Sequence, residues 1–514
     1  MNHALAYYSG PWTDRQLKHL LSRVLFGVTK ENHDFFKGKS MAECLDILLK
    51  PSSLPPPPSI KTDDSEIMDG KSFVFLPKSA DNESGRTLMV KAWWVDQMLS
   101  QNLSITEKMV LFWHNHFVVE FDKTVKDSRY AYQYLCLLRQ NALGNVKKLT
   151  REITTTPAML VYLNGNENNK AATNENYARE LQELFTVGKG PDSLYTEDDV
   201  KAMAKILSGW KDDEDKITSY FSPDFHNEEN KELSGFYGNR TIKGRKGEAG
   251  ARETDELVEY IFTNPEVSKF LCRKLYRWFV HFNIDEKVEE KVITPLAKIM
   301  VQSNYEMAPV LKALFASEIF YDPYLIGGMF KSPTDYLIGL LRTMKVEFSQ
   351  DDGNAKRYSE LWAIAVTLGL LGQDLGDPPN VAGWPAYYEE PYYYKVWINT
   401  ENLTYRNKLA RLLSYPEESD KLLIIDFIGF VSAFSNPYNA QELLADILGL
   451  LCVVQPGEKK RAYMLARLNE DGKWAEAWTA LEKKPDDDIL KKQIVDRLRR
   501  LFDVIFTMPE IQVM

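Results

Sequence analysis

The segment Ser104-Ile105-Thr106-Glu107-Lys108-Met109-Val110-Leu111-Phe112-Trp113-His114-Asn115-His116-Phe117 decides the expected fold class of this chain. Ser104 and Glu107 have the spacing of a capping box, which predicts a helix that begins near Ile105. The large apolar side chains then recur at helical spacing and share one face, namely Ile105, Met109, Phe112, Trp113 and Phe117. The segment therefore predicts an amphipathic helix packed on a hydrophobic core.

The same helical periodicity recurs along the chain. Thr13 is an expected N-cap, and Gly27 closes the apolar stripe that follows it. Further helices are expected at 41–49, from Arg86 onward, at 104–117, 130–141 and 174–185. Long irregular regions at 211–252 and 376–399 predict loops, and only 72–76 suggests a strand. The fold class is therefore predicted as mainly α, a large multi-helix globular array with long loops and at most a few short strands.

The length of 514 residues exceeds what one core usually organises, so subdomains are expected. We predict N-terminal helices over 1–50 and a Pro-rich polar loop over 51–85. The main helical domain should span 86–400 and carry the motifs. A C-terminal helical subdomain, 401–514, should pack on it.

Charge and hydrophobicity argue against two classes of protein, those that bind nucleic acid and those that span a membrane. A net charge of −10 argues against a nucleic-acid footprint, and no stretch approaches the ~18 consecutive apolar residues of a membrane span. The first residues lack the basic and apolar regions of an export signal, which predicts a cytoplasmic protein. The four cysteines lie far apart in apolar patterns, which is typical of buried thiols in a reducing compartment.

His114 and His116 are candidate metal ligands, and His114 is also a candidate catalytic residue. On a regular helix the two side chains differ by about 200°, so they converge on one ion only if the helix is distorted. The alternative is a buried, hydrogen-bonded histidine together with one on the other face.

The segment 174–185 has an apolar stripe and an opposite charged face. Glu175 and Glu183 each lie four residues from Arg179, a spacing that permits ion pairs. Glu180 and Glu183 are candidate catalytic carboxylates, because adjacent like charges raise one pKa, and Glu175 and Arg179 are candidate binding residues. The alternative is a solvated surface ladder.

The aromatic loop after Pro378 supplies further candidate binding residues, Asn380, Trp384 and Tyr392. Flat aromatic faces can stack on sugar rings while the carboxamide donates and accepts hydrogen bonds. The alternative places Trp384 in the core beside Trp397.

Several motifs together resemble the bacterial family catalogued as domain of unknown function 1800. They are 20–27, 111–117, 174–184, 195–200, Gly209-Trp210, 331–333 and 378–385. The resemblance implies no reaction, cofactor or catalytic residue, but it suggests an envelope or extracellular role, so a periplasmic or extracellular location stays open. It also suggests a sulfatase-like partner protein encoded nearby. Family members tend to have His-Asp where this chain has His226-Asn227, so we expect His226, the third candidate metal ligand, to be a surface histidine.

Two functions from different classes follow. The first is a helical binding or scaffolding protein whose polar-aromatic cleft holds a saccharide or a partner protein. The alternative is a hydrolase of a polar substrate, such as a carbohydrate, that uses a divalent metal ion or acid-base chemistry. The cofactor is unknown.

Overall fold

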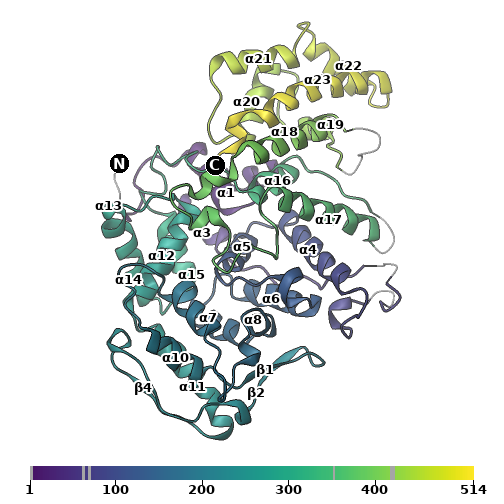
Figure 1. Cartoon of the computed structure of the whole chain (residues 1–514). Coiled ribbons are helices and arrows are strands. Elements are labelled where there is room, and N and C mark those ends of the chain that lie inside the picture. Colours follow the sequence, from purple (N-terminus) through teal and green to yellow (C-terminus); the bar gives the residue numbers. More distant parts are fainter. Residues whose placement is uncertain (1–3, 61–63, 68–70, 351–353, 417–422) are drawn as a thin grey trace.

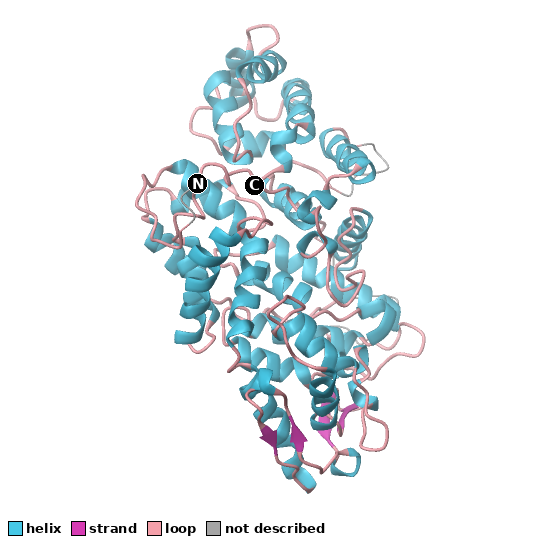
Figure 2. Cartoon of the chain, turned by 60° about the vertical axis from the view of Figure 1, so that its left-hand side comes forward, coloured by secondary structure: helices cyan, strands magenta, loops and turns pink. Residues whose placement is uncertain are grey.

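The structure is a computed structural model that describes residues 4–60, 64–67, 71–350, 354–416 and 423–514. Helices make up most of the chain, and the strands form two small antiparallel hairpins at one end of the molecule (Figures 1 and 2). The strands are β1 (Trp210–Asp213), β2 (Thr218–Phe221), β3 (Lys231–Glu232) and β4 (Thr241–Ile242). The predicted mainly α fold class is confirmed. The hairpins lie inside the predicted 211–252 loop.

The N-terminal helices are α1 (Asp14–Val24), α2 (Lys30–Phe36) and α3 (Met41–Leu48). The prediction for the first of them is confirmed, since Thr13 is its N-cap. Gly27 then turns the chain at a φ of +72°, where a Cβ would lie 2.3 Å from the carbonyl oxygen of Gly339. Only glycine allows this approach of the chain to the later helix α16 (Pro333–Thr343).

The centre of the molecule contains α4 (Glu83–Leu99), α5 (Thr106–His116) and α6 (Ser128–Gln140). The predicted amphipathic character of α5 is wrong, because every residue of this helix is buried. The predicted capping box is also wrong. Ile105 is the N-cap, and the Glu107 carboxylate instead binds the Arg139 guanidinium at 2.6 and 2.8 Å. A helix buried on all sides must pair its charges internally.

The other helices of the main body surround this centre. They are α7 (Val146–Thr154), α8 (Pro157–Tyr162), α9 (Asn176–Glu180), α10 (Glu197–Ile206), α11 (Arg252–Ile261), α12 (Pro265–Phe279), α13 (Glu286–Val288), α14 (Thr294–Gln302), α15 (Met307–Phe315) and α17 (Ala355–Leu370). The predicted strand at 72–76 is wrong, because Phe73–Phe75 form a 3₁₀ turn. Part of the predicted 51–85 loop, residues 61–63 and 68–70, lies outside the described residues.

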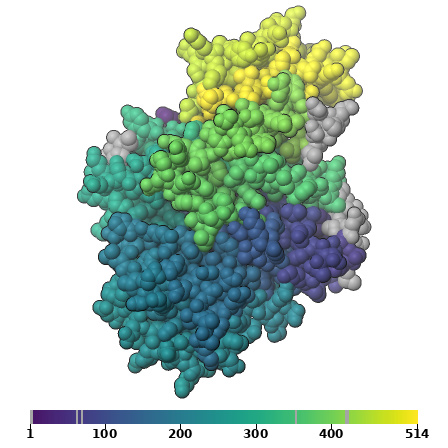
Figure 3. Space-filling model, in the orientation of Figure 1, coloured from purple at the N-terminus to yellow at the C-terminus, as the bar shows by residue number. Residues whose placement is uncertain are grey.

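The C-terminal segment forms the lobe at the top of Figures 1 and 3. Its helices are α18 (Thr400–Ser414), α19 (Phe427–Ser432), α20 (Ala440–Leu451), α21 (Glu458–Leu468), α22 (Trp474–Lys483) and α23 (Asp488–Thr507). Helices α18, α19, α21 and α22 all contact α23, so the longest helix forms the centre of this lobe. The predicted domain boundaries stay predictions. None of the described helices is both long and apolar enough to cross a membrane.

Candidate functional site

His114 lies near the C-terminal end of α5 in a fully buried aromatic environment. Its Nδ1 is 3.1 Å from the Tyr134 hydroxyl, which itself donates to the Phe117 carbonyl at 2.6 Å. The imidazole therefore donates from Nδ1, and its Nε2 has no hydrogen-bond partner among the described residues. The indole rings of Trp94 and Trp384 lie 5.2 and 5.7 Å from the imidazole. Burial lowers the pKa of His114 to about 3, so the ring is neutral.

His116 lies in a different environment. Its Nε2 is 3.0 Å from the carbonyl oxygen of Phe185, and its ring packs against Phe117 at 4.4 Å. Burial lowers the pKa of His116 well below its ordinary value. The two histidines thus have separate partners, as expected for an undistorted helix.

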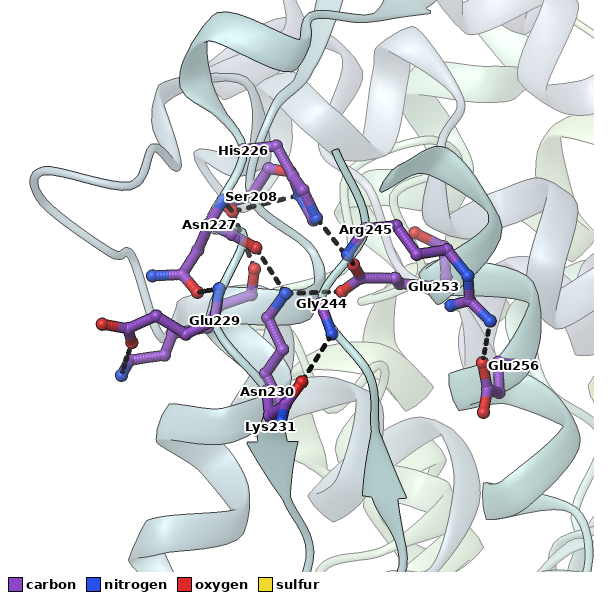
Figure 4. A network of polar contacts seen from close by, with 12 residues as sticks. Ser208, His226, Asn227, Glu229, Asn230, Lys231, Gly244, Arg245, Glu253 and Glu256 are labelled. Carbon is purple, nitrogen blue, oxygen red and sulfur yellow. Dashed lines mark hydrogen bonds and ion pairs between the residues drawn. The ribbon is translucent and has the colours of Figure 1, made fainter. Parts of the chain in front are cut away.

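His226 occupies a buried polar cluster shown in Figure 4. The prediction of a surface histidine is wrong, since only 1% of this residue is exposed. Its Nδ1 donates to the Ser208 carbonyl at 2.8 Å, and its Nε2 lies 3.1 Å from Glu253 Oε1. Glu253 Oε2 accepts from Lys231 Nζ at 2.5 Å. We call His226, Lys231 and Glu253 the His226 cluster.

Glu253 supplies a carboxylate partner for His226, which the uncharged side chain of Asn227 cannot provide. Burial alone would raise the pKa of Glu253, but hydrogen bonds from His226 and Lys231 outweigh it and lower the pKa. Glu253 also accepts the backbone N–H of Arg245 at 2.6 Å. No local spacing rule indicates this carboxylate, because it lies on α11, far from the histidine in the chain.

The metal-ligand candidates do not come together. His114 contacts Trp94 and Trp384, His116 contacts Phe185, and His226 pairs with a single carboxylate. In residues 4–514, apart from the undescribed gaps, no group of three or more His, Cys, Asp or Glu side chains is placed to hold a metal ion.

The segment 174–185 folds as α9 followed by a π-helical turn, Leu181–Thr186. The predicted ion pairs are present, with Arg179 lying 3.2 Å from Glu175 and 3.9 Å from Glu183. Arg179 also pairs with Glu197 through two hydrogen bonds of 2.8 and 2.7 Å. We call Glu175, Arg179, Glu183 and Glu197 the Arg179 ladder.

Glu180 differs from the members of the ladder. This half-buried carboxylate has no hydrogen bond or ion pair with any residue that the structure describes, and burial, followed by the charge of Glu183, raises its pKa. Burial also raises the pKa of Tyr162, with further contributions from Glu120, Glu180 and Asp377. The carboxylates of Glu120, Glu180 and Asp377 therefore all act on the Tyr162 hydroxyl.

Lys91 binds three carboxylates at once. Its Nζ lies 2.6 Å from Asp122, 2.8 Å from Asp377 and 3.1 Å from Asp374. Burial alone would lower the pKa of Lys91, but the carboxylates, Asp377 foremost, outweigh it and raise the pKa. Burial raises the pKa of Asp122 and of Asp374. These four residues form the Lys91 cluster, which has two more acidic groups than basic ones.

Asp122 also lines an open cleft of about 1120 Å³, which we call the polar cleft. Its lining residues come from 75–87, the start of α6 with the turn before it, and the β1–β2 turn: Phe75, Leu76, Pro77, Lys78, Ser79, Ala80, Glu83, Ser84, Thr87, Asp122, Lys126, Arg129, Glu214, Asp215 and Ile217. Glu83 fixes one wall by accepting the backbone N–H groups of Ser79 at 3.1 Å and Ser128 at 2.5 Å. Phe75 is 65% exposed.

The family model described as a protein of unknown function (DUF1800) matches residues 19–513, nearly the whole chain. The chain belongs to the DUF1800 family. No curated protein and no solved structure matches it. The matched range contains the α5 motif, the Arg179 ladder, the His226 cluster and the Lys91 cluster.

The segment after Asp377 contacts the C-terminal part of α5. The backbone N–H of Trp384 donates to Asn115 Oδ1 at 2.8 Å. Gly383 precedes it at a φ of +94°, where a Cβ would lie 2.4 Å from the same oxygen. Trp384 is fully buried against His114, so its ring is a core group. The expected neighbour Trp397 instead packs near Tyr387, at 6.3 Å.

The remaining candidate binding residues of this DUF1800 chain lie at the surface. Asn380 Nδ2 donates to the Tyr388 hydroxyl at 2.7 Å, and Tyr392 is 60% exposed. The polar cleft is lined by none of Glu175, Arg179, Asn380, Trp384 and Tyr392. No residue pattern in 75–87 indicated the cleft, because its walls come from separated segments.

Proposed function

We propose that the chain is a helical binding protein whose polar cleft holds a saccharide. The observation that carries this proposal is a cleft of about 1120 Å³ in which hydroxyl, carboxylate and cationic groups surround an exposed phenylalanine. Sugar hydroxyls form hydrogen bonds with all three kinds of polar group. The apolar face of a sugar ring can stack on an aromatic side chain.

The cleft offers these groups at fixed positions. Lys78 pairs with Glu214 at 2.7 Å, and Asp122 is oriented by Lys91. The Phe75 ring packs against the buried ring of Tyr132, with the two ring centroids 6.2 Å apart. A preformed wall costs little ordering entropy when a ligand binds.

Titration of the purified chain with neutral and acidic oligosaccharides tests the proposal. Phe75→Ala should weaken binding about tenfold, equivalent to ~1.4 kcal/mol, because the stacking face is lost. Phe35→Ala is the matched control, since Phe35 is 44% exposed and does not line the cleft. Equal affinities for both variants would refute the cleft as the binding site.

The alternative function is an acid-base hydrolase, and the raised pKa of Glu180 favours it. A carboxyl group whose pKa is raised by burial is better suited to act as a general acid beside a second, ionised carboxylate. Glu180→Gln should abolish hydrolysis of a polysaccharide that the wild type cleaves, whereas Glu175→Gln in the Arg179 ladder should retain it. Full activity of Glu180→Gln excludes this mechanism.

A partner protein, such as a sulfatase-like protein encoded nearby, is a further proposed occupant of the cleft. Four free cysteines support a reducing compartment, which agrees with the cytoplasmic location proposed from the sequence. Fractionation of cells that produce the full-length chain tests the location.

A further inference from the structure

A second site lies between α1, α16, α20 and the C-terminal end of the chain, away from the polar cleft. A small cavity of about 40 Å³ adjoins a groove of about 560 Å³ between α1 and α20. Lys18, Cys452 and Val453 line both spaces. A volume of about 40 Å³ corresponds to roughly three water-sized groups, which matches a carboxylate and the first carbon attached to it.

Lys331 is a half-buried lysine that lines this cavity. Its backbone is fixed, because the N–H donates to the Gln512 carbonyl at 2.8 Å and the carbonyl accepts from Arg406 at 2.9 Å. Its ammonium group has no hydrogen bond or ion pair with any described residue. Asp335 is the carboxylate in the cavity lining, and it is already engaged by Lys108 and by the Ser332 hydroxyl. Lys331 therefore has no ion pair of its own within the described part of the chain.

The groove lining has one more basic than acidic side chain, since Arg15 and Lys18 line it together with Asp14. Arg15 lines it without an ion partner among the described residues, while Lys18 pairs with Asp14 at 2.5 Å. A Cβ at Gly449 would lie 3.1 Å from Lys18 Nζ, so the glycine lets α20 approach this lysine closely. The cavity is lined mainly by aliphatic side chains, Leu340, Leu450, Leu451, Val453, Ile511 and Met514, together with Ser22, Tyr336, Thr343 and Cys452. The apolar residues of the groove are Ala445, Val453 and Val454.

We propose that this site binds a short aliphatic carboxylate, whose carboxylate pairs with the Lys331 ammonium while its chain extends along the groove toward Arg15. A half-buried cation without an ion pair has lost part of its hydration, and a bound anion offsets that loss. Burial lowers the pKa of Lys331 to about 8, and an adjacent carboxylate opposes this shift by favouring the charged form. In the groove, Ala445, Val453 and Val454 accommodate methylene groups, and the aliphatic side chains of the cavity disfavour strongly hydrated inorganic anions.

Calorimetric titration with acetate, butyrate and glutarate tests the site. Butyrate and glutarate should bind saturably to the wild type, and Lys331→Met should weaken both at least tenfold. Lys312→Met is the control, because Lys312 pairs with Asp46 outside the cavity and should leave binding unchanged. Arg15→Gln should weaken glutarate, which carries a second carboxylate, more than butyrate. Equal affinity of the wild type and Lys331→Met would overturn the proposal.

A second measurement does not depend on the folding of the variant. In wild-type protein labelled with ¹³C at the lysine ε carbon, saturating butyrate should raise the titration midpoint of one lysine by at least one pH unit. Loss of that resonance in Lys331→Arg assigns it to Lys331. A midpoint that butyrate leaves unchanged would overturn the proposal, because a merely structural lysine does not respond to the ligand.

Discussion

The His226 cluster and the Lys91 cluster are both built around a buried lysine, yet they have opposite compositions. In the His226 cluster one carboxylate serves Lys231, His226 and a backbone N–H, and the charged side chains are no more than 1% exposed. In the Lys91 cluster one lysine serves three carboxylates, and the side chains of Asp122 and Asp374 are 35% and 47% exposed. The closed cluster has no exposed charged group with which a ligand could interact. An open cluster with excess acid can also interact with a ligand in the adjoining polar cleft.

Removal of the single carboxylate should break the closed cluster. Glu253→Gln leaves Lys231 and His226 buried without a negative charge, and we expect unfolding to become about 3–5 kcal/mol more favourable. Urea denaturation followed by tryptophan fluorescence measures this change. In the control Glu256→Gln the lost partner is the partly exposed Arg245, so the change should stay below about 1 kcal/mol. Similar values for the two variants would show that the His226 cluster is not a closed unit.

Removal of the lysine should break the open cluster less severely. Lys91→Met leaves three carboxylates around an apolar side chain, and we expect a loss of about 3 kcal/mol at pH 7. The loss should shrink as the pH falls, because Asp122 and Asp374 already have raised pKa values and can take up protons in the folded state. Denaturation of wild type and variant at pH 7 and pH 5 measures both effects. A loss that does not depend on pH would contradict this account.

The two clusters also show what the sequence can predict. The range of α1, the N-cap Thr13 and the turn at Gly27 follow from periodicity and capping within one short segment. The Lys91 cluster joins three distant segments, so no local pattern indicates it. The misassigned capping box has the same cause, because the partner of Glu107 is Arg139 on another helix. Local rules therefore predict elements, whereas partners of buried charges depend on tertiary packing.

His114 differs from both clusters, because it is buried and has no carboxylate partner among the residues that the structure describes. Its folded-state pKa of about 3 lies below the ordinary value of 6.5, so the unfolded chain binds more protons between these pH values. Stability contributed by the neutral ring is complete above pH 6.5 and is lost as the pH falls toward 3. His114→Phe should therefore reduce the loss of stability between pH 7 and pH 5 by about 2 kcal/mol.

Thermal or urea denaturation of His114→Phe at the two pH values measures this difference. His116→Phe should show a similar reduction, since burial also lowers the pKa of His116. An unchanged pH dependence in both variants would mean that the imidazoles gain protons in the folded state, which requires a carboxylate or water contact at the ring.

The Arg179 ladder is more exposed than either cluster, so its disruption should have the smallest effect on the free energy of unfolding. Arg179 and Glu197 have side-chain exposures of 32% and 66%, so water and salt screen their attraction. Arg179→Gln should change the free energy of unfolding by less than about 1 kcal/mol, and the difference should vanish in 1 M salt, unlike that of Lys91→Met. The same variant, titrated with oligosaccharide, distinguishes two surfaces of the molecule. Unchanged affinity agrees with binding in the polar cleft. A tenfold loss of affinity without loss of stability would instead place the saccharide at the Arg179 ladder. The exposed charged groups of the ladder contribute little to the stability of the fold, so they are available to bind a ligand.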